Sequence, residues 1–169
     1  MKIRITLILS ILVLLSYVTK AQTPAEKIKE LGLDLPTIPE PSGSFVKWRQ
    51  VGNLLYLSGN GPDVFGKLGT ELTIEEGYQA ARETGIEIIA VLQKATGDLT
   101  RIKQFVKVLG MVNSAPEFKD HPKVINGFSD LMIEVFGEKG RHARSAVGVV
   151  GLPGNMAVEI EVIVELNDE

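Results

Sequence analysis

Residues 144–164 read RSAVGVVGLPGNMAVEIEVIV, and this stretch predicts the last two strands of a β-sheet. The Leu-Pro-Gly-Asn turn in its middle predicts that the two strands pair with each other. The second strand alternates strictly, so its β-branched residues and its glutamates would lie on opposite faces. We therefore expect Arg144 and Glu159 to meet near one cleft, where an arginine can hold a carboxylate and a glutamate can move a proton. The alternative for Glu159 is a solvated position on the open face.

Apolar spacing upstream of this stretch predicts the rest of the domain. The first long helix has the clearest boundaries, because Thr73 and Glu76 form a capping box at its start and Gly97 ends it. The predicted order is β-β-α-β-α-β-β, in which two amphipathic helices cover one face of a sheet and leave the other face uncovered. An uncovered face with apolar residues predicts self-association. The other predicted elements are a hairpin of residues 45–51 and 54–58, a strand over residues 103–111 and a helix over residues 121–136.

The first 21 residues predict a secretory signal peptide. Lys2 and Arg4 precede an apolar run over residues 5–18 that is short for a membrane-spanning helix. Thr19 and Ala21 are small residues at the two key positions for cleavage after Ala21. We therefore expect a secreted or periplasmic protein without membrane attachment after cleavage, and an uncleaved anchor is the alternative.

The chain after this peptide divides into two parts. Residues 22–43 predict a short helix over residues 24–31 and then a proline-rich arm. Residues 44–169 form the predicted globular domain, which is long enough to bury a core of its own.

The composition argues against several classes of function. The chain has no cysteine, so neither a disulfide nor a thiol nucleophile is available. Loss of Lys2, Arg4 and Lys20 with the signal peptide changes the formal net charge from −3 to −6, which argues against a surface built for nucleic acid. His121 and His142 have no second ligand at a useful spacing, so no metal site is predicted.

The motif Arg-Ser-x-Val-x-Val-x-x-Leu-Pro, followed by Val-Glu-Ile-Glu, closely resembles the C-terminal signature of the Rid family. These are the YjgF-type reactive-intermediate deaminases, also labelled endoribonuclease L-PSP. Upstream, the segment FVKWRQVGNLLYLSGNGP at residues 45–62 is similar to the opening hairpin of the family. The resemblance covers roughly residues 44–166. It implies a chorismate-mutase-like α+β fold, a homotrimer, and ligand clefts that lie between subunits.

The resemblance also implies a role for each candidate site residue. The arginine of the motif binds the substrate carboxylate in the family, so Arg144 is expected to do so here, with pairing to a nearby glutamate as the alternative. Glu159 falls at the acidic position of the family, which handles water or a proton. The implied substrate-binding residues are Ser58 and Gly59, whose backbone lines the cleft, Asn126 on the second long helix, and Phe45 on the opening hairpin. A tight strand end is the alternative for Ser58 and Gly59. His142 lies two positions before Arg144, and a place at the edge of the cleft is the minor alternative for it.

Two positions depart from the family pattern. Phe45 stands where many members have tyrosine, and Ala146 stands where several have cysteine. A hydroxyl and a thiol are therefore missing from the implied cleft, which affects substrate choice, but the carboxylate-binding arginine is retained.

Three functions follow from this reading. The first is hydrolytic deamination of small 2-imino or 2-enamino acids to 2-oxo acids and ammonia, without a cofactor. The second is a non-catalytic trimer that binds a small carboxylate as a sensor or carrier. The third is a ribonuclease, as the older family label suggests, and the acidic mature charge and the lack of a histidine pair make it the weakest of the three.

Overall fold

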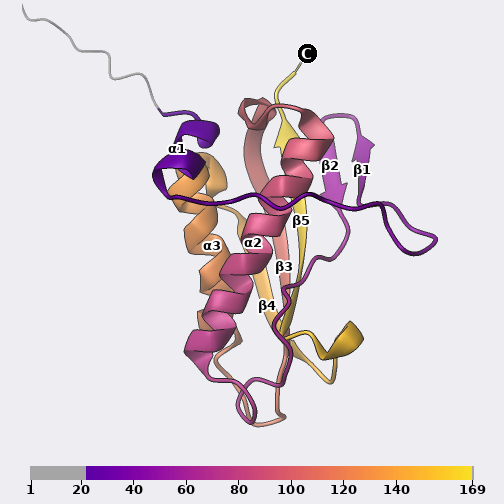
Figure 1. Ribbon diagram of the computed structural model, residues 1–169, viewed down its shortest axis with the longest axis vertical. Coiled ribbons are helices and arrows are strands. Elements are labelled where there is room, and N and C mark those ends of the chain that lie inside the picture. Colours follow the sequence, from indigo (N-terminus) through magenta and orange to yellow (C-terminus); the bar gives the residue numbers. More distant parts are fainter. Residues whose placement is uncertain (1–21, 169) are drawn as a thin grey trace, which may run out of the picture.

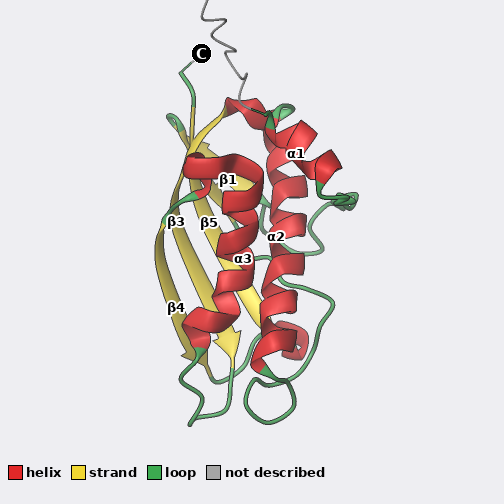
Figure 2. Ribbon diagram, turned by 90° about the vertical axis from the view of Figure 1, so that its left-hand side faces the viewer, coloured by secondary structure: helices red, strands yellow, loops and turns green. Residues whose placement is uncertain are grey.

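The fold has two layers, a mixed sheet and two long helices, in a computed structural model that describes residues 22–168. Both long helices cover the same face of the sheet, and no described element covers the other face (Figures 1 and 2). This confirms the predicted α+β architecture, while the predicted signal peptide lies outside the described residues. The helices and strands are α1 (Pro24–Glu30), β1 (Trp48–Val51), β2 (Leu54–Leu57), α2 (Ile74–Thr96), β3 (Ile102–Asn113), α3 (His121–Phe136), β4 (Ala143–Val149) and β5 (Val158–Leu166), with short 3₁₀ turns at Leu99–Arg101, Gly137–Gly140 and Pro153–Asn155.

The predicted helix boundaries are confirmed by their capping geometry. The Thr73 hydroxyl accepts a hydrogen bond from the Glu76 N–H, and the Glu76 carboxylate accepts one from the Thr73 N–H. Gly97 ends α2 in the left-handed region with a φ of 73°, a conformation that glycine adopts at little cost. No helix within residues 22–168 is both long and apolar enough to span a membrane.

The strand order β1-β2-β5-β3-β4 contradicts one prediction. The last two strands do not pair, because β3 lies between them, parallel to β4 and antiparallel to β5. The C-terminal end of β3 is hydrogen-bonded along both of its edges. The Asn113 N–H donates to the Ala157 carbonyl just before β5, and the Ser114 N–H donates to the Val149 carbonyl at the end of β4. Adjacent strands lie about 4.8 Å apart, so the connection after β4 needs to span only about 10 Å to cross the end of β3.

The core lies between the sheet and the two long helices. On β5, Val158, Ile160, Val162 and Val164 face the helices and are at most 1% exposed, as their alternation predicts. The glutamates between them lie on the open face. The β5 register therefore decides which face of the sheet each polar residue reaches.

The N-terminal segment packs on the outside of the helical layer. Helix α1 lies against α3, with Ile28 buried, and the arm that follows runs across α2 (Figure 1). Lys94 on α2 holds the arm by donating to the Ile38 carbonyl at 3.0 Å and pairing with Glu40 at 2.8 Å.

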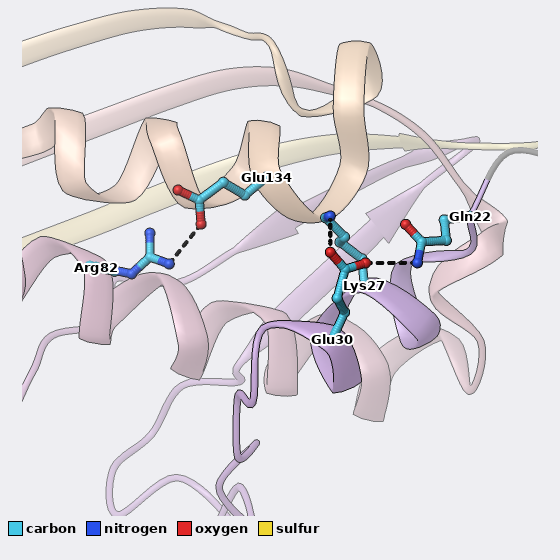
Figure 3. Close-up of polar contacts among 5 residues, drawn as sticks. All are labelled: Gln22, Lys27, Glu30, Arg82 and Glu134. Atoms are coloured by element: carbon cyan, nitrogen blue, oxygen red, sulfur yellow. Dashed lines mark hydrogen bonds and ion pairs between the residues drawn. The ribbon is translucent and has the colours of Figure 1, made fainter.

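Polar contacts on the outside of the helical layer add little stability. Figure 3 shows Arg82 on α2 paired with Glu134 on α3, with a nitrogen–oxygen distance of 2.6 Å. It also shows Glu30 of α1 bonded to Lys27 and Gln22. Surface pairs of this kind contribute about 0–1 kcal/mol each, so burial of the apolar face holds the helices on the sheet.

Gly127→Ala is expected to destabilise the protein, because α2 and α3 are in backbone contact at Gly127. A Cβ at this position would lie 1.9 Å from the Tyr78 carbonyl oxygen, and no rotamer change relieves a contact with backbone. Alanine gains about 1 kcal/mol in helix propensity, whereas overpacking costs about 1–3 kcal/mol or more. Because the clash is with backbone, the upper end of this cost applies, and we expect the free energy of unfolding in urea, at fixed protein concentration, to fall by about 2 kcal/mol.

Gly151→Ala is the matched control, since a Cβ there meets no atom within 4 Å and the backbone φ is not positive. Its effect should stay within about 0.5 kcal/mol. Equal effects of the two substitutions would contradict the close helix contact.

Candidate functional site

Arg144 lies on β4 with its side chain between the sheet and α3. It is in register with Val108 on β3, which is fully buried, so both side chains point toward the helices. Arg144 Nη1 donates to Asn126 Oδ1 and to Ser129 Oγ, both at 2.9 Å, and Nη2 donates to the Pro122 carbonyl at 3.5 Å. The guanidinium is thus positioned by three neutral oxygens of α3.

The charge of Arg144 has no carboxylate partner among residues 22–168. Burial lowers the pKa of the guanidinium, and the more distant Asp130 carboxylate opposes this shift. An arginine remains cationic despite such a shift. Its three bonds to α3 leave two of five N–H groups, including the one on Nε, for an anionic ligand.

His142 completes this group of residues, which we call the arginine cluster: Asn126, Ser129, His142 and Arg144. His142 Nδ1 lies 2.7 Å from the Gly140 carbonyl, so Nδ1 carries the hydrogen, and Nε2 lies 3.0 Å from Ser129 Oγ. Burial lowers the pKa of His142, and the charge of Arg144 lowers it further. A neutral His142 accepts the Ser129 hydroxyl hydrogen, which leaves the lone pairs of Ser129 for Arg144.

Ser129 was not among the residues predicted from the sequence. It lies three residues after Asn126 on α3, and this spacing places both side chains on one face of a helix. That spacing was the available signal. His142 contacts Ser129, and Asn126 contacts Arg144 directly.

The other predicted residues form a second group, the glutamate cluster, which consists of Phe45, Ser58, Gly59 and Glu159. The Glu159 side chain packs directly against the backbone of Gly59. A Cβ added to Gly59 would lie 2.0 Å from Glu159 Oε1. Ser58 Oγ donates to the Val46 carbonyl at 2.7 Å. Phe45 is 51% exposed and lines a pocket of about 420 Å³ together with Ser58.

Burial also affects the acidic residue of this cluster. Glu159 is half-buried, and burial raises the pKa of its carboxyl, with a smaller contribution from the charge of Glu161. A raised pKa suits a carboxyl group that exchanges protons near neutral pH. Next to it, the buried Asn60 donates to the Ser58 carbonyl, while its Oδ1 has no hydrogen-bond partner among the described residues.

The two clusters do not meet within one protomer, contrary to the expectation for Arg144 and Glu159. Glu159 is in register with Met111 on the open face, whereas Arg144 points toward the helices. Moreover, β4 forms one edge of the sheet, and β3 and β5 separate it from β2. The cause is the insertion of β3 between the last two strands. Within residues 22–168, no group of three or more acidic, histidine or cysteine side chains is arranged to hold a metal ion.

Comparison with known proteins relates this arrangement to a family. The family model described as "YjgF/chorismate_mutase-like, putative endoribonuclease" matches residues 26–166. Protein TCP17 of Trypanosoma cruzi is 42% identical over 151 residues, which cover 85% of this chain and 94% of that protein. A 2-iminobutanoate/2-iminopropanoate deaminase of Dermatophagoides farinae is 31% identical over 133 residues, covering 78% of this chain and 93% of the relative.

The fold itself is also found among solved structures. A protein of unknown function from Agrobacterium tumefaciens has a crystal structure that superposes with a TM-score of 0.79 at 39% sequence identity. The match covers 86% of this chain and 94% of that one. The family model and these relatives cover the sheet, both long helices and the arginine motif, and the chain belongs to the Rid family of YjgF/chorismate-mutase-like proteins.

Proposed function

We propose that the protein hydrolyses small 2-imino or 2-enamino acids to 2-oxo acids and ammonia. The observation that carries this proposal is Arg144, a positioned guanidinium with N–H groups left for a ligand and no carboxylate partner in the described chain. The deaminase relative, at 31% identity, supports the same reaction class. Members of a family can differ in chemistry, so the assignment depends on this site.

We further propose that the site forms between subunits of a homotrimer. The arginine cluster of one subunit would face the glutamate cluster of its neighbour, because one protomer holds them apart. The open face of the sheet, which β5 lines with Glu159, Glu161, Ile163 and Glu165, is the surface available for this contact (Figure 2). Its partly exposed apolar residues are Tyr56, Val106, Leu109, Met111, Val147 and Ile163.

The reaction needs only positioning and one proton-transfer group. Arg144 would bind the substrate carboxylate, and backbone groups near Gly59 would hold the reacting C=N group. Glu159 would take a proton from water as the water oxygen bonds to the imine carbon. The same carboxyl would return this proton to nitrogen, which gives a carbinolamine. It would then pass the proton of the carbinol hydroxyl to nitrogen as the C–N bond breaks, so that ammonia leaves and the 2-oxo acid forms. Asn126 and Ser129 would keep the guanidinium in place.

A non-catalytic carboxylate-binding trimer is the second candidate. Phe45 and Ala146 favour it, because they place a phenyl ring and a methyl group where many relatives have a hydroxyl and a thiol. Export after cleavage following Ala21, which remains a proposal based on the sequence alone, would also separate the protein from cytoplasmic sources of imines.

Arg144→Ala is expected to lower kcat/KM by about 100-fold or more, since a charge-assisted hydrogen bond is worth about 1.5–3 kcal/mol and two would be lost. Arg144→Lys should restore only part of it, because an ammonium lacks the planar fork. The assay measures ammonia from imines that an amino-acid oxidase generates in situ. Arg141→Ala is the control, as Arg141 is exposed and pairs with Glu138. Wild-type rates equal to buffer would rule out the enzyme and leave the binding trimer.

Glu159→Gln is expected to reduce turnover far more than ligand affinity, because the amide keeps the shape of the side chain but cannot accept a proton. Mixing the Arg144→Ala and Glu159→Gln proteins, followed by unfolding and refolding together, should restore about one quarter of wild-type activity by random assortment in a cyclic trimer. Only a site shared between subunits permits this recovery. If the mixture stays as inactive as either variant while light scattering shows trimers, the shared site is wrong.

The pKa of His142 predicts a pH dependence of substrate binding. The folded-state pKa of His142 is lower than the ordinary value of 6.5, so the imidazole is neutral at pH 7 and becomes protonated as the pH falls below 6.5 through this lowered pKa. Protonation turns His142 Nε2 from a hydrogen-bond acceptor for the Ser129 hydroxyl into a donor. It also adds a positive charge beside Arg144. KM should therefore rise at low pH, and the change in kcat should be smaller.

The same shift has a defined effect on stability. Because the unfolded chain binds the proton more readily, the contribution of His142 to the free energy of unfolding is lost as the pH falls below 6.5. His142→Phe should remove both pH effects, and its ring can keep the contacts with Phe105 and Phe128. Parallel KM profiles of wild type and His142→Phe between pH 7.5 and 5.5 would contradict the role of His142.

A further inference from the structure

A second pocket lies where β3 and β4 end and α3 begins. Its volume is about 560 Å³. None of the residues that line it is acidic, and the proposed reaction uses none of them. They are Lys67, Ser114, Ala115, Pro116, Phe118, His121, Gly148, Val149 and Val150.

Lys67 brings a fixed positive charge to this pocket. Its ammonium donates to Asn113 Oδ1 and to the Val150 carbonyl, both at 2.7 Å. Among residues 22–168, no carboxylate forms an ion pair with Lys67 Nζ. An ammonium has three hydrogens, so one remains after these two bonds.

The anchor of Lys67 is itself held in place. Asn113 is fully buried, and its amide nitrogen bonds to Asn155 Oδ1 at 2.9 Å. The two neutral oxygens therefore restrict the ammonium without neutralising it. A restricted cation loses little further conformational entropy when it binds an anion.

Ser114 and His121 supply a second donor. His121 Nε2 lies 3.1 Å from Ser114 Oγ, and Ser114 is buried. The pair rests on Gly148, where a Cβ would lie 2.3 Å from His121 Nε2 and 2.8 Å from Ser114 Oγ. When His121 Nε2 carries the hydrogen and donates to Ser114 Oγ, the Ser114 O–H is left for a ligand; in the other tautomer the free N–H is on Nδ1.

The rest of the wall is apolar. The Phe118 ring packs edge-on against the His121 ring at a centroid distance of 5.3 Å, and Val149 and Val150 line the wall at the end of β4. A cation, a hydroxyl–imidazole pair and an apolar wall are the groups that bind a carboxylate attached to a short hydrocarbon chain.

We propose that this pocket binds a small carboxylate with an apolar tail, at a site separate from Arg144. One carboxylate oxygen would accept from Lys67 and the other from the Ser114–His121 pair, while the tail would contact Phe118 and Val150. On β4, Gly148 lies four residues after Arg144, which corresponds to about 13 Å along a strand. The two sites can therefore bind two separate small molecules.

Titration calorimetry of the purified protein with hexanoate tests the proposal, with neutral hexanamide as the matched probe. The titrations use the Arg144→Ala variant, so that the proposed catalytic site does not contribute. Hexanoate should bind, and hexanamide should bind at least about ten-fold more weakly, since it cannot make the charge-assisted bond. Adding Lys67→Met should weaken hexanoate binding by a similar factor.

Lys139→Met is the control, because Lys139 also donates to a backbone carbonyl, that of Ile102, but lies outside the pocket. It should leave hexanoate binding unchanged. If Lys67→Met does not fold, His121→Phe provides the same test and keeps the ring beside Phe118. If neither Lys67→Met nor His121→Phe weakens hexanoate binding, the proposed carboxylate site in this pocket is wrong. Binding to wild type but not to Arg144→Ala would also overturn it and would leave the proposed deaminase intact.

Discussion

The structure depends on burial of one face of β5 against α2 and α3. The β-branched residues of this strand are almost completely excluded from solvent, so a shift by one residue would move all of them to the open face. This burial fixes the register of β5 with β3, and β3 in turn fixes the register of β4. As a result, Glu159 lies on the open face and Arg144 faces α3, although the two residues are only fifteen positions apart in the chain.

This separation gives the open face of the sheet its proposed role. In the proposed function, the arginine cluster on the edge strand β4 would bind the substrate carboxylate, and the glutamate cluster at β5 would transfer the proton. Proton transfer between a fixed carboxyl and a bound substrate requires both within hydrogen-bond reach. Association through the open face would bring them together and would also bury apolar residues such as Met111 and Val147. In this proposal the same contact stabilises the trimer and completes the site.

Arg144 and Lys67 are held in the same way, by neutral oxygens. Such oxygens orient a cation but leave its charge available, whereas a carboxylate would neutralise it and compete with the ligand. Some other cations of the described chain are paired with acids, as in Arg82–Glu134 and Lys94–Glu40. Lys107 and Lys139 also donate to neutral oxygens. Arg144 belongs to a family motif, and Lys67 is distinguished by its place in a pocket lined by Ser114 and His121.

The local features of the protein follow from residues that are neighbours in the chain. The capping box at Thr73, the left-handed Gly97, the hairpin at Gly52 and the alternation of β5 are set by neighbouring residues, and each was predicted from them. The motif around Arg144 likewise identified the family. Strand pairing, in contrast, depends on long-range packing: β3 pairs with β4 on one edge and with β5 on the other, and no local pattern in the sequence encodes this order. Packing of the helices on the sheet also brings Ser129 within hydrogen-bond distance of Arg144 and His142, and Ser114 within that distance of His121. It places Lys67 in the same pocket as Ser114 and His121. These groups come from separate segments of the chain, so no local pattern relates them.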